Sequence, residues 1–444
     1  METAGIVAEY NPFHNGHAWQ LAEIKRQLGD VPVIACMSGY FVQRGESSIA
    51  SPFIRAEMAV RGGVDLVVAL PTAYSLRSAD FFALGAVQTL AATGLVTHLI
   101  CGTETTGAPS SPSLPETANW SLTAEAENGV HRFLQEGSSY AAAWEKSAES
   151  WQKGASFWFS HPNTILALAY QKTILQHCPS MQLRTLPRQG SDYKEEILTP
   201  PYASAAAIRH ALSQRAVSPR MPASAETERQ EAVVGNKTAA VSERQASARK
   251  DRQKELAGVV PETTLSLLEH IESYPLRLAR QENNMTLLLS HCLLTADSRQ
   301  LFEYSSAGAD LCQRFYKTRE ALERGYGYFC QQVANKRDSL PMVQRLALQL
   351  MLRHPRGFWL QPPSPSYLRV LAFNRRGRSL LRQMKETASL PVIIKLSDSL
   401  RNAALAADTL LQTDIAAADL YHLLSGRAGL YGAAFRTSPF YLPQ

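Results

Sequence analysis

Short apolar segments alternate with segments of helical spacing through the first 105 residues of the chain. Apolar runs at 6–8, 31–37, 65–70 and 98–101 are typical of short buried strands. The segments between them carry apolar residues at intervals of three or four, which predicts helices over 17–28, 52–61 and 79–93. Strands joined by helices at this spacing pair in parallel. The pattern therefore predicts an α/β fold with a doubly wound parallel sheet.

Later segments follow different patterns. A stretch rich in Ser, Pro and Thr at 105–122 predicts a loop, and helical spacing resumes over 124–151 and 162–176. A strand is predicted at 181–186 and a short helix within 202–212. Helical spacing dominates from 261 onward, with one strand predicted at 391–394.

Three units are expected along the chain. Residues 1–212 form the α/β domain, and 259–444 form a mostly helical C-terminal region. Between them, 213–258 contains too few apolar residues to offset the entropy of ordering. This middle segment is therefore predicted to be a flexible polar insert.

The composition is typical of a globular protein, because 45% of the 444 residues are hydrophobic and 19% are charged. No apolar run approaches the roughly 18 residues of a membrane span, and the N-terminus lacks the pattern of a secretory signal. A cytoplasmic protein is predicted, with no membrane or protein partner. The cysteines are scattered without a C-x-x-C pair, so they are expected to be reduced and to bind no zinc: Cys36, Cys101, Cys178, Cys292, Cys312 and Cys330.

Positive charge is concentrated at 339–385, a stretch without any Asp or Glu. Clustered Lys and Arg residues are typical of surfaces that bind nucleic acid. An ordinary solvated face, neutralised by acidic residues from elsewhere, is the alternative. The nine basic residues of this basic stretch exceed the net charge of +6 of the whole chain: Arg345, Arg353, Arg356, Arg369, Arg375, Arg376, Arg378, Arg382 and Lys385.

The candidate chemistry lies directly after the first predicted strand. Asn11-Pro12 ends that strand, and His14 and His17 flank the start of the next helix, with Gly16 between them. A helix N-terminus carries unpaired N–H groups and a positive dipole, so it binds anions. Two imidazoles there can donate hydrogen bonds to phosphate oxygens, and a glycine permits close backbone approach. The first βα unit of an open α/β sheet is also where nucleotides bind.

The string Glu-Tyr-Asn-Pro-Phe-His-Asn-Gly-His at 9–17 resembles the signature of the HIGH-type nucleotidyltransferase superfamily. Together with Met-Ser-Gly at 37–39 and Phe-Val-Gln-Arg-Gly-Glu at 41–46, it resembles the bacterial tRNA(Met) cytidine acetate ligases. The resemblance is dense over 1–105 and returns near 160–210 and 367–396. It implies a Rossmann-like nucleotidyltransferase domain with a parallel sheet, followed by a helical, tRNA-binding region.

The resemblance also implies an activity. Members of this family activate acetate with ATP as acetyl-adenylate, then acetylate N4 of the wobble cytidine of elongator tRNA(Met), releasing AMP and pyrophosphate. His14 and His17 are the expected catalytic residues, because charge develops on phosphate oxygens in such a step. ATP, with Mg2+, is expected to contact the strand end, the loop and the first helical turn: Val7, Ala8, Glu9, Tyr10, Asn11, Pro12, Phe13, His14, Asn15, Gly16, His17, Ala18, Trp19 and Gln20.

Three further positions resemble ATP-contacting residues of the family. Gly102 follows the fourth predicted strand, where a glycine either lets adenosine lie against the backbone or only forms a turn. Asn163 can both donate and accept hydrogen bonds to adenine or ribose, although Ala167 stands where the family usually has glycine. Arg188 is a candidate bidentate partner for phosphate, or an ordinary surface arginine.

Ser204 to Arg209 resembles the second motif of the superfamily, S-x-T-x-I-R, with Ala206 in place of the expected hydroxyl. The fold of that loop is expected to persist, whereas a direct role of position 206 is in doubt. The sequence does not decide whether acetate or cytidine is bound by the next candidates, which are Gln43, Arg44 and Glu46.

Unstacked anticodon bases can stack on aromatic or arginine side chains. Tyr367, Phe373 and the pair Arg375-Arg376 are candidates for this contact, and Phe373 is equally compatible with a core position. The sequence identifies no base for the cytidine amine.

Two other functions are compatible with the sequence. A nucleotidyltransferase acting on a small phosphorylated substrate would need neither the basic stretch nor affinity for tRNA. A tRNA-binding protein with a vestigial ATP site is disfavoured by the intact His14, Gly16 and His17, although Ala206 fits it. Acetylation of elongator tRNA(Met) with acetate and ATP is the function predicted.

Overall fold

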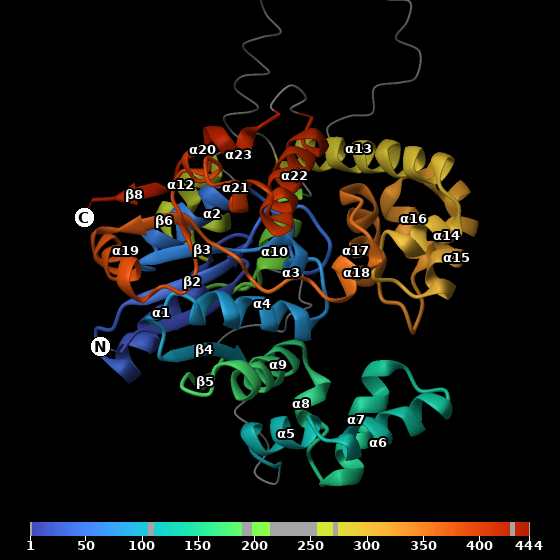
Figure 1. Cartoon of the computed structure of the whole chain (residues 1–444), viewed down its shortest axis with the longest axis horizontal. Helices are drawn as coiled ribbons and strands as arrows, with labels where there is room; N and C mark the ends of the chain where they lie inside the picture. Colours follow the sequence, from blue (N-terminus) through green and yellow to red (C-terminus); the bar gives the residue numbers. More distant parts are fainter. Residues whose placement is uncertain are drawn as a thin grey trace, which may run out of the picture.

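An eight-stranded sheet lies at the centre of the protein in the order β5-β4-β1-β2-β3-β6-β7, with β8 paired to β6 (Figure 1). The computed structural model describes residues 2–104, 111–188, 198–213, 255–269, 274–426 and 431–443. The strands are β1 (Ala4–Ala8), β2 (Val33–Ser38), β3 (Leu66–Leu70), β4 (His98–Thr103), β5 (Gln182–Pro187), β6 (Leu368–Asn374), β7 (Val392–Ile393) and β8 (Phe440–Leu442).

The first five strands pair in parallel, as the apolar pattern predicts. β1 lies between β2 and β4, so the chain reverses its direction of winding beside β1. In open α/β sheets, ligands bind at the carboxyl ends of the strands at such a switch point. The end of β1 is therefore the place where the fold itself provides a crevice.

Helices cover both faces of this parallel part. Alternate strand residues point to opposite faces, so Ile34 and Cys36 join one core while Val33 and Ala35 join the other. The first core includes residues of α4 (Ala79–Ala91) and α9 (Pro162–His177), and the second those of α1 (Asn15–Leu28) and α2 (Pro52–Arg61). Ser51 caps α2 by accepting the Ile54 N–H, which confirms the predicted start of that helix.

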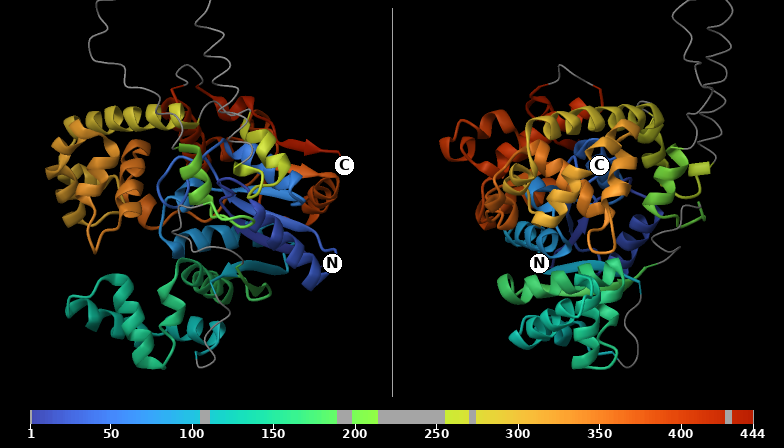
Figure 2. Two further views of the ribbon diagram at one scale, coloured as in Figure 1. Left: turned by 180° about the vertical axis from the view of Figure 1, so that it is seen from behind. Right: turned by 90° about the vertical axis from the view of Figure 1, so that its right-hand side faces the viewer.

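Two helical lobes extend from the sheet-containing body, and they are separate in both views of Figure 2. The first consists of α5 (Leu114–Ser121), α6 (Ala124–Gln135), α7 (Tyr140–Trp151) and α8 (Phe157–Ser160). The second consists of α13 (Tyr274–Thr295), α14 (Ser298–Glu303), α15 (Ala309–Lys317), the 3-10 helix η2 (Arg319–Arg324), α16 (Tyr326–Val333), α17 (Leu340–Leu352) and α18 (Arg356–Leu360).

Shorter or peripheral helices complete the structure. They are α3 (Thr72–Ser75), α10 (Ala205–Ser213), α12 (Glu262–Glu269), α19 (Arg375–Thr387), α20 (Leu396–Ser399), α21 (Ala403–Ala406), α22 (Thr409–Leu424) and α23 (Ala433–Arg436).

The prediction of a loop over 105–122 is wrong for its second half, which forms α5. Ser113 accepts the N–H of Glu116, and the Glu116 carboxylate accepts the Ser113 N–H in return. This reciprocal capping box, with Pro115 in the first turn, starts a helix inside a Ser- and Pro-rich segment. Residues 105–110 lie outside the described part of the chain.

The prediction of one strand after residue 261 is also incomplete. β7 lies at the predicted place, but β6 and β8 extend the sheet as well. β6 pairs antiparallel with β3, so the sheet is mostly rather than wholly parallel. The basic character of the surrounding stretch hid β6, because Arg369 interrupts its apolar run yet is itself 5% exposed.

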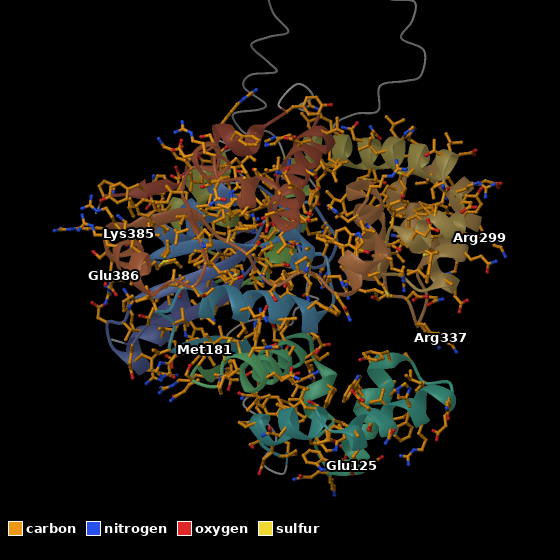
Figure 3. All side chains as sticks on the ribbon, in the orientation of Figure 1. Glu125, Met181, Arg299, Arg337, Lys385 and Glu386 are labelled. Carbon is orange, nitrogen blue, oxygen red and sulfur yellow. The ribbon has the colours of Figure 1, made fainter. Side chains whose placement is uncertain are left out.

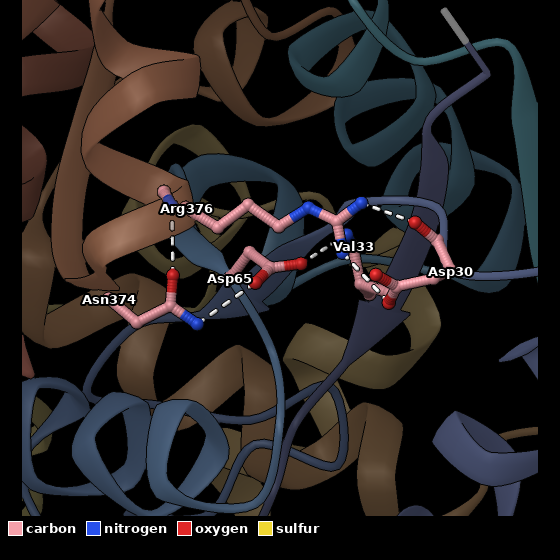
Figure 4. Close-up of polar contacts among 6 residues, drawn as sticks. Asp30, Val33, Asp65, Asn374 and Arg376 are labelled. Atoms are coloured by element: carbon pink, nitrogen blue, oxygen red, sulfur yellow. Dashed lines mark hydrogen bonds and ion pairs between the residues drawn. The ribbon is translucent and has the colours of Figure 1, made fainter. Parts of the chain in front are cut away.

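The helix α19 lies at the amino edge of the parallel strands, opposite the ends that form the β1 crevice. The Asn374 amide donates to Asp65 Oδ1 at 2.9 Å, and Asp65 Oδ2 accepts the Val33 N–H at 2.8 Å (Figure 4). Arg376 forms an ion pair with Asp30 at 3.0 Å. Asp30 and Asp65 precede β2 and β3, so this network attaches the start of α19 to the amino ends of both strands.

Most of the predicted flexible insert, 214–254, lies outside the described residues. At its described end, Leu256 is buried beside Ile208, so this last part packs against α10. The cysteines named above are all free thiols. Within the described ranges, no helix has both the length and the apolar character of a membrane span.

Candidate active site

A pocket opens at the carboxyl ends of β1, β4 and β5, where the fold places its crevice. Residues far apart in the sequence meet there, from the β1 end, the start of α9 and the start of α10. It is lined by thirteen of the seventeen residues predicted to contact ATP: Val7, Ala8, Glu9, Tyr10, Asn11, His14, Gly16, His17, Trp19, Gln20, Gly102, Asn163 and Arg188.

The two histidines form a capping box at the start of α1. His14 Nδ1 accepts the Gly16 N–H at 3.1 Å, and His17 Nδ1 accepts the His14 N–H at 3.2 Å. Each Nδ1 therefore lacks a hydrogen, which places the hydrogen of a neutral ring on Nε2. Both imidazoles, with ring centroids 3.8 Å apart, are thus arranged as Nε2–H donors.

Both rings stay neutral at physiological pH. Burial, reinforced by the charges of Arg188 and Arg209, lowers the pKa of His14 to about 3. Burial also holds the pKa of His17 well below its ordinary value, with His14 and Arg188 contributing. The site therefore offers hydrogen-bond donors rather than imidazolium charges, and positive charge comes from the arginines.

Two glycines make room for these side chains. A Cβ atom at Gly16 would lie 2.9 Å from Cε1 of His14, so the capping ring requires glycine at this position. A Cβ atom at Gly102 would lie 3.0 Å from Cγ of Arg188. Arg188 therefore lies over Gly102, and its side chain forms no hydrogen bond or ion pair with other described residues. Its guanidinium group is available to an anion.

Asn163 is oriented by Glu104, a residue that the sequence analysis did not single out. Glu104 Oε1 accepts the backbone and side-chain N–H groups of Asn163, at 3.1 and 2.7 Å. Its Oε2 accepts the Thr164 N–H at 3.1 Å, so the carboxylate also caps the first turn of α9. The amide oxygen of Asn163 accepts no hydrogen bond from the described residues, so it can accept one from an amino or hydroxyl group of a ligand.

The second motif has the expected local fold. Ser204 Oγ accepts the Ala207 N–H at 3.0 Å and caps α10. The first turn of α10, which includes Ala206, lines the pocket. Arg209 donates to the Asn11 carbonyl at 2.8 Å and lies 3.7 Å from Glu46. Arg209 thus braces the loop after β1, while its positive charge contributes to the lowered pKa of His14.

The loop after β2 forms another wall. Gln43 and Arg44 line the pocket, whereas Glu46 is absent from the described lining and pairs with Arg209 instead. The Gln43 carbonyl accepts from Arg345 of α17 at 2.9 Å. This contact joins the second helical lobe to the pocket and gives Arg345 a structural role that its place in the basic stretch did not indicate.

Four predicted contacts, Pro12, Phe13, Asn15 and Ala18, do not line the pocket. The Asn15 amide instead donates to the carbonyls of Pro201 and Gly258, both at 3.1 Å. Apolar wall residues were missed by the sequence analysis, because single apolar residues in buried elements carry no distinctive signal: Phe82, Leu166, Tyr170 and Leu186.

The basic stretch divides into arginines that are bonded to other parts of the fold and basic residues that are exposed on one helix. Arg345, Arg356 and Arg369 donate to backbone carbonyls, and Arg376 pairs with Asp30. Four exposed residues lie at intervals of three and four along α19, so they share one face of the helix. We call them the α19 basic face: Arg375, Arg378, Arg382 and Lys385. Figure 3 shows Lys385 at the outer surface.

The stacking candidates are placed differently from one another. Tyr367 is fully buried, and its hydroxyl donates to Asp414 at 2.5 Å, so it is not available to stack on a base. Phe373 packs against Tyr441, with ring centroids 5.1 Å apart. Its partly buried position in β6 corresponds to the core alternative.

A doubly wound sheet with two imidazole donors at the first helix N-terminus defines the class of nucleotide-binding α/β enzymes. Comparison with known proteins is more specific. A family model described as HIGH Nucleotidyl Transferase matches residues 1–430. A protein of Fervidobacterium nodosum named tRNA(Met) cytidine acetate ligase is 31% identical over 88% of this chain and 84% of its own. A protein of the same name from Syntrophomonas wolfei is 31% identical over 99% of both chains.

Solved structures agree with this assignment. The crystal structure of Thermotoga maritima TmcAL bound with alpha-thio ATP matches with a TM-score of 0.77 and 25% identity, over 100% of both chains. Its apo form matches with a TM-score of 0.79. The chain belongs to the tRNA(Met) cytidine acetate ligase family of HIGH nucleotidyl transferases.

Proposed function

We propose that this protein activates acetate with ATP and transfers the acetyl group to N4 of the wobble cytidine of elongator tRNA(Met). The family membership supports the reaction, and the pocket provides groups suited to it. The observation that carries the proposal is that two neutral Nε2–H donors lie around one helix N-terminus together with Arg188, whose side chain has no partner among the described residues. These groups can bind phosphate oxygens together.

In the first step, an acetate oxygen attacks the α-phosphorus of ATP and pyrophosphate leaves. Negative charge develops on the phosphate oxygens, and donors aimed at that charge lower the barrier. We assign this role to His14 and His17, with Arg188 supplying positive charge. The capping box holds both rings before the substrate binds, so little reorganisation is needed.

We assign adenosine recognition to the β4–α9 side of the pocket. The amide oxygen of Asn163, held by Glu104, is suited to accept from the adenine amino group or a ribose hydroxyl. The apolar wall formed by Leu166, Tyr170 and Leu186 is suited to cover the base. Gln43 and Arg44 on the opposite wall are the candidates for acetate or cytidine.

We include Mg2+ in the proposal as an ion carried mainly by the ATP phosphates. Among the described residues, no group of three His, Cys, Asp or Glu side chains is placed to hold a metal. Mg2+ commonly retains several waters and is bound through substrate phosphates with one or two carboxylates. The ion would neutralise charge on the phosphates, and this chain's own residues would orient them.

We propose the α19 basic face as a secondary contact for the tRNA backbone. It lies at the amino edge of the sheet, at least one strand length, about 17–20 Å, from the pocket. It would therefore contact the tRNA away from the wobble base. The chain around the pocket would hold the anticodon itself.

The test is acetylation of tRNA(Met) with labelled acetate and ATP. The proposal predicts labelled N4-acetylcytidine and one AMP for each acetyl group, and no full-rate reaction with acetyl-coenzyme A alone. Acetylation from acetyl-coenzyme A without ATP would contradict it. So would adenylation of a small phosphorylated substrate without any labelling of tRNA.

A further inference from the structure

Glu9, at the end of β1, is the only carboxylate among the described residues that line the pocket. The Gln43 N–H donates to Oε1 at 2.7 Å, and the backbone carbonyl of Glu9 accepts from Arg55. The other carboxylate oxygen, Oε2, has no hydrogen-bond partner in the part of the chain that the structure describes. One oxygen is thus fixed by the protein, and the other is free to meet a substrate.

Acetyl transfer needs an acceptor for a proton. An exocyclic amine that forms an amide must lose one hydrogen, and a base placed beside it raises the rate. His14 and His17 are poorly suited, because Nδ1 already accepts a backbone N–H and Nε2 carries the hydrogen. A pKa of about 3 also makes His14 a weak base.

Other titratable groups of the pocket hold their protons. Burial raises the pKa of the Cys101 thiol to about 12. Burial likewise raises the pKa of the Tyr10 and Tyr170 hydroxyls above their ordinary value. A carboxyl group ordinarily ionises below neutral pH, so Glu9 is the pocket group suited to accept a proton.

We propose that Glu9 is the catalytic base of the second step, accepting the proton that cytidine N4 loses. This proposal rests on the proposed function. N4 attacks the carbonyl carbon of acetyl-adenylate and forms the C–N bond. The bond from that carbon to the phosphate oxygen breaks, and AMP leaves with the electron pair. The N4 proton passes to Oε2 of Glu9, which returns it to water after the product leaves.

The surroundings tune the carboxylate for this role. Burial is the largest influence and raises the pKa of Glu9, which improves it as a proton acceptor. The Gln43 N–H and the charges of Arg209 and Arg55 act in the opposite direction, and Glu46 raises the pKa further. Tyr170, which faces this charge from α9, is protonated and adds none.

A role in binding ATP is the competing explanation, since Glu9 belongs to the string expected to contact ATP. A carboxylate repels a bare triphosphate, so a contact with ATP would have to involve the ribose, the adenine, the backbone of Glu9 or a Mg2+ ion carried by the phosphates. The two roles differ in which half-reaction they serve, because ATP is consumed before the tRNA reacts.

The experiment measures both half-reactions of Glu9→Gln in the full chain. Acetate-dependent exchange between ATP and pyrophosphate, without tRNA, reports the first step. Single-turnover transfer from acetyl-adenylate to tRNA(Met), followed from pH 4.5 to 8, reports the second. Gln keeps the acceptor for the Gln43 N–H but cannot take a proton. Glu57→Gln on α2, where Glu57 pairs with Arg61, is the matched control.

We expect Glu9→Gln to keep exchange within a few-fold of wild type and to slow transfer by roughly 10²–10⁴-fold. The wild-type transfer rate should fall as acid protonates Glu9, and this acidic limb should vanish in the variant. Glu9→Asp should transfer slowly but retain the limb.

Transfer at the wild-type rate in Glu9→Gln would overturn the proposal. Equal loss of both half-reactions would overturn it in favour of a role in ATP binding or activation. If Glu9→Gln fails to fold, loss of the acidic limb in Glu9→Asp would overturn it. Absence of acetate-dependent exchange in the wild type would refute the proposed function itself.

Discussion

The pocket and the α19 basic face are built on different principles. The pocket joins residues from β1, the loop after β2, β4, α9, β5 and α10, and several of them, such as His14, His17 and Asn163, are held by further contacts. The α19 basic face is a row of four side chains on one helix, exposed and independent of one another. A change in the pocket should therefore disturb several groups together. A change in the basic face should remove one charge at a time.

This difference separates rate from affinity. In the proposed mechanism the pocket donors act on charge that develops during the reaction, so their loss should appear mainly in turnover. The α19 basic face is proposed to attract the tRNA backbone over a long range, so its loss should appear in tRNA binding and in its salt dependence. Pocket variants should therefore lose turnover and keep tRNA affinity, whereas variants of the α19 basic face should lose tRNA affinity and keep turnover.

The largest effect is expected from His14→Ala or His17→Ala. Each removes one Nε2–H donor and breaks the capping box, and loss of such a donor typically costs about 10²–10³ in rate. Acetate-dependent pyrophosphate exchange should fall by that factor while tRNA affinity stays within about twofold. His177→Ala, at the exposed end of α9, is the control. Near-normal exchange in both pocket variants would refute their assignment.

Arg188→Ala should have the next largest effect. A charge-assisted hydrogen bond contributes roughly 1.5–3 kcal/mol, so ATP affinity should fall about 10–100-fold. The pKa of His14 should rise toward its ordinary value, because a positive charge that lowers it is removed. Calorimetry with ATP and nuclear magnetic resonance titration of the ring test the two effects. An unchanged affinity would place Arg188 outside the phosphate site.

The basic face should produce a smaller, graded effect. The triple variant with Arg375→Ala, Arg378→Ala and Arg382→Ala should have a shallower slope when the logarithm of the tRNA binding constant is plotted against the logarithm of the salt concentration. The expected reduction is about two units, because each phosphate contact contributes roughly 0.7–0.9 to the slope. Arg376→Ala should leave the slope unchanged and cost at most about 1 kcal/mol of stability, because Arg376 pairs with Asp30. Equal slopes for the triple variant and wild type would make the face an ordinary solvated surface.

The smallest effect is expected from Glu104→Gln. This variant tests whether a pocket residue, Asn163, depends on the contact that orients it. The carboxylate caps α9 and orients Asn163. Its loss should cost about 1 kcal/mol of stability and lower ATP affinity a few-fold. Thermal unfolding and ATP titration measure these losses. A variant that loses stability but binds ATP normally would show that Asn163 does not need this orientation.

The two regions also differ in how well the sequence predicts them. The order and spacing of His14, Gly16 and His17 already specify a strand, a turn and a helix N-terminus, so the pocket lies where expected. The number of arginines in a stretch does not indicate which of their side chains face solvent. In the structure, Arg345, Arg356 and Arg369 donate to backbone carbonyls instead.

Contacts between distant segments could not be predicted from one sequence. Nothing near Glu104 indicates that it will orient Asn163, 59 residues later. β6 was hidden because its apolar run contains Arg369, which only the tertiary structure buries. Local sequence patterns determine where helices end and where strands lie. The walls of the pocket, in contrast, depend on which distant segments of the chain pack beside β1.

The most direct test of the account is acetate-dependent exchange between ATP and pyrophosphate, measured without tRNA for three proteins. These are the wild type, the His14→Ala/His17→Ala variant and the triple arginine variant of α19. Exchange should require acetate, persist in the α19 variant and fall at least about 10²-fold in the histidine variant. Exchange that is independent of acetate, or that is lost in the α19 variant but kept in the histidine variant, would contradict it.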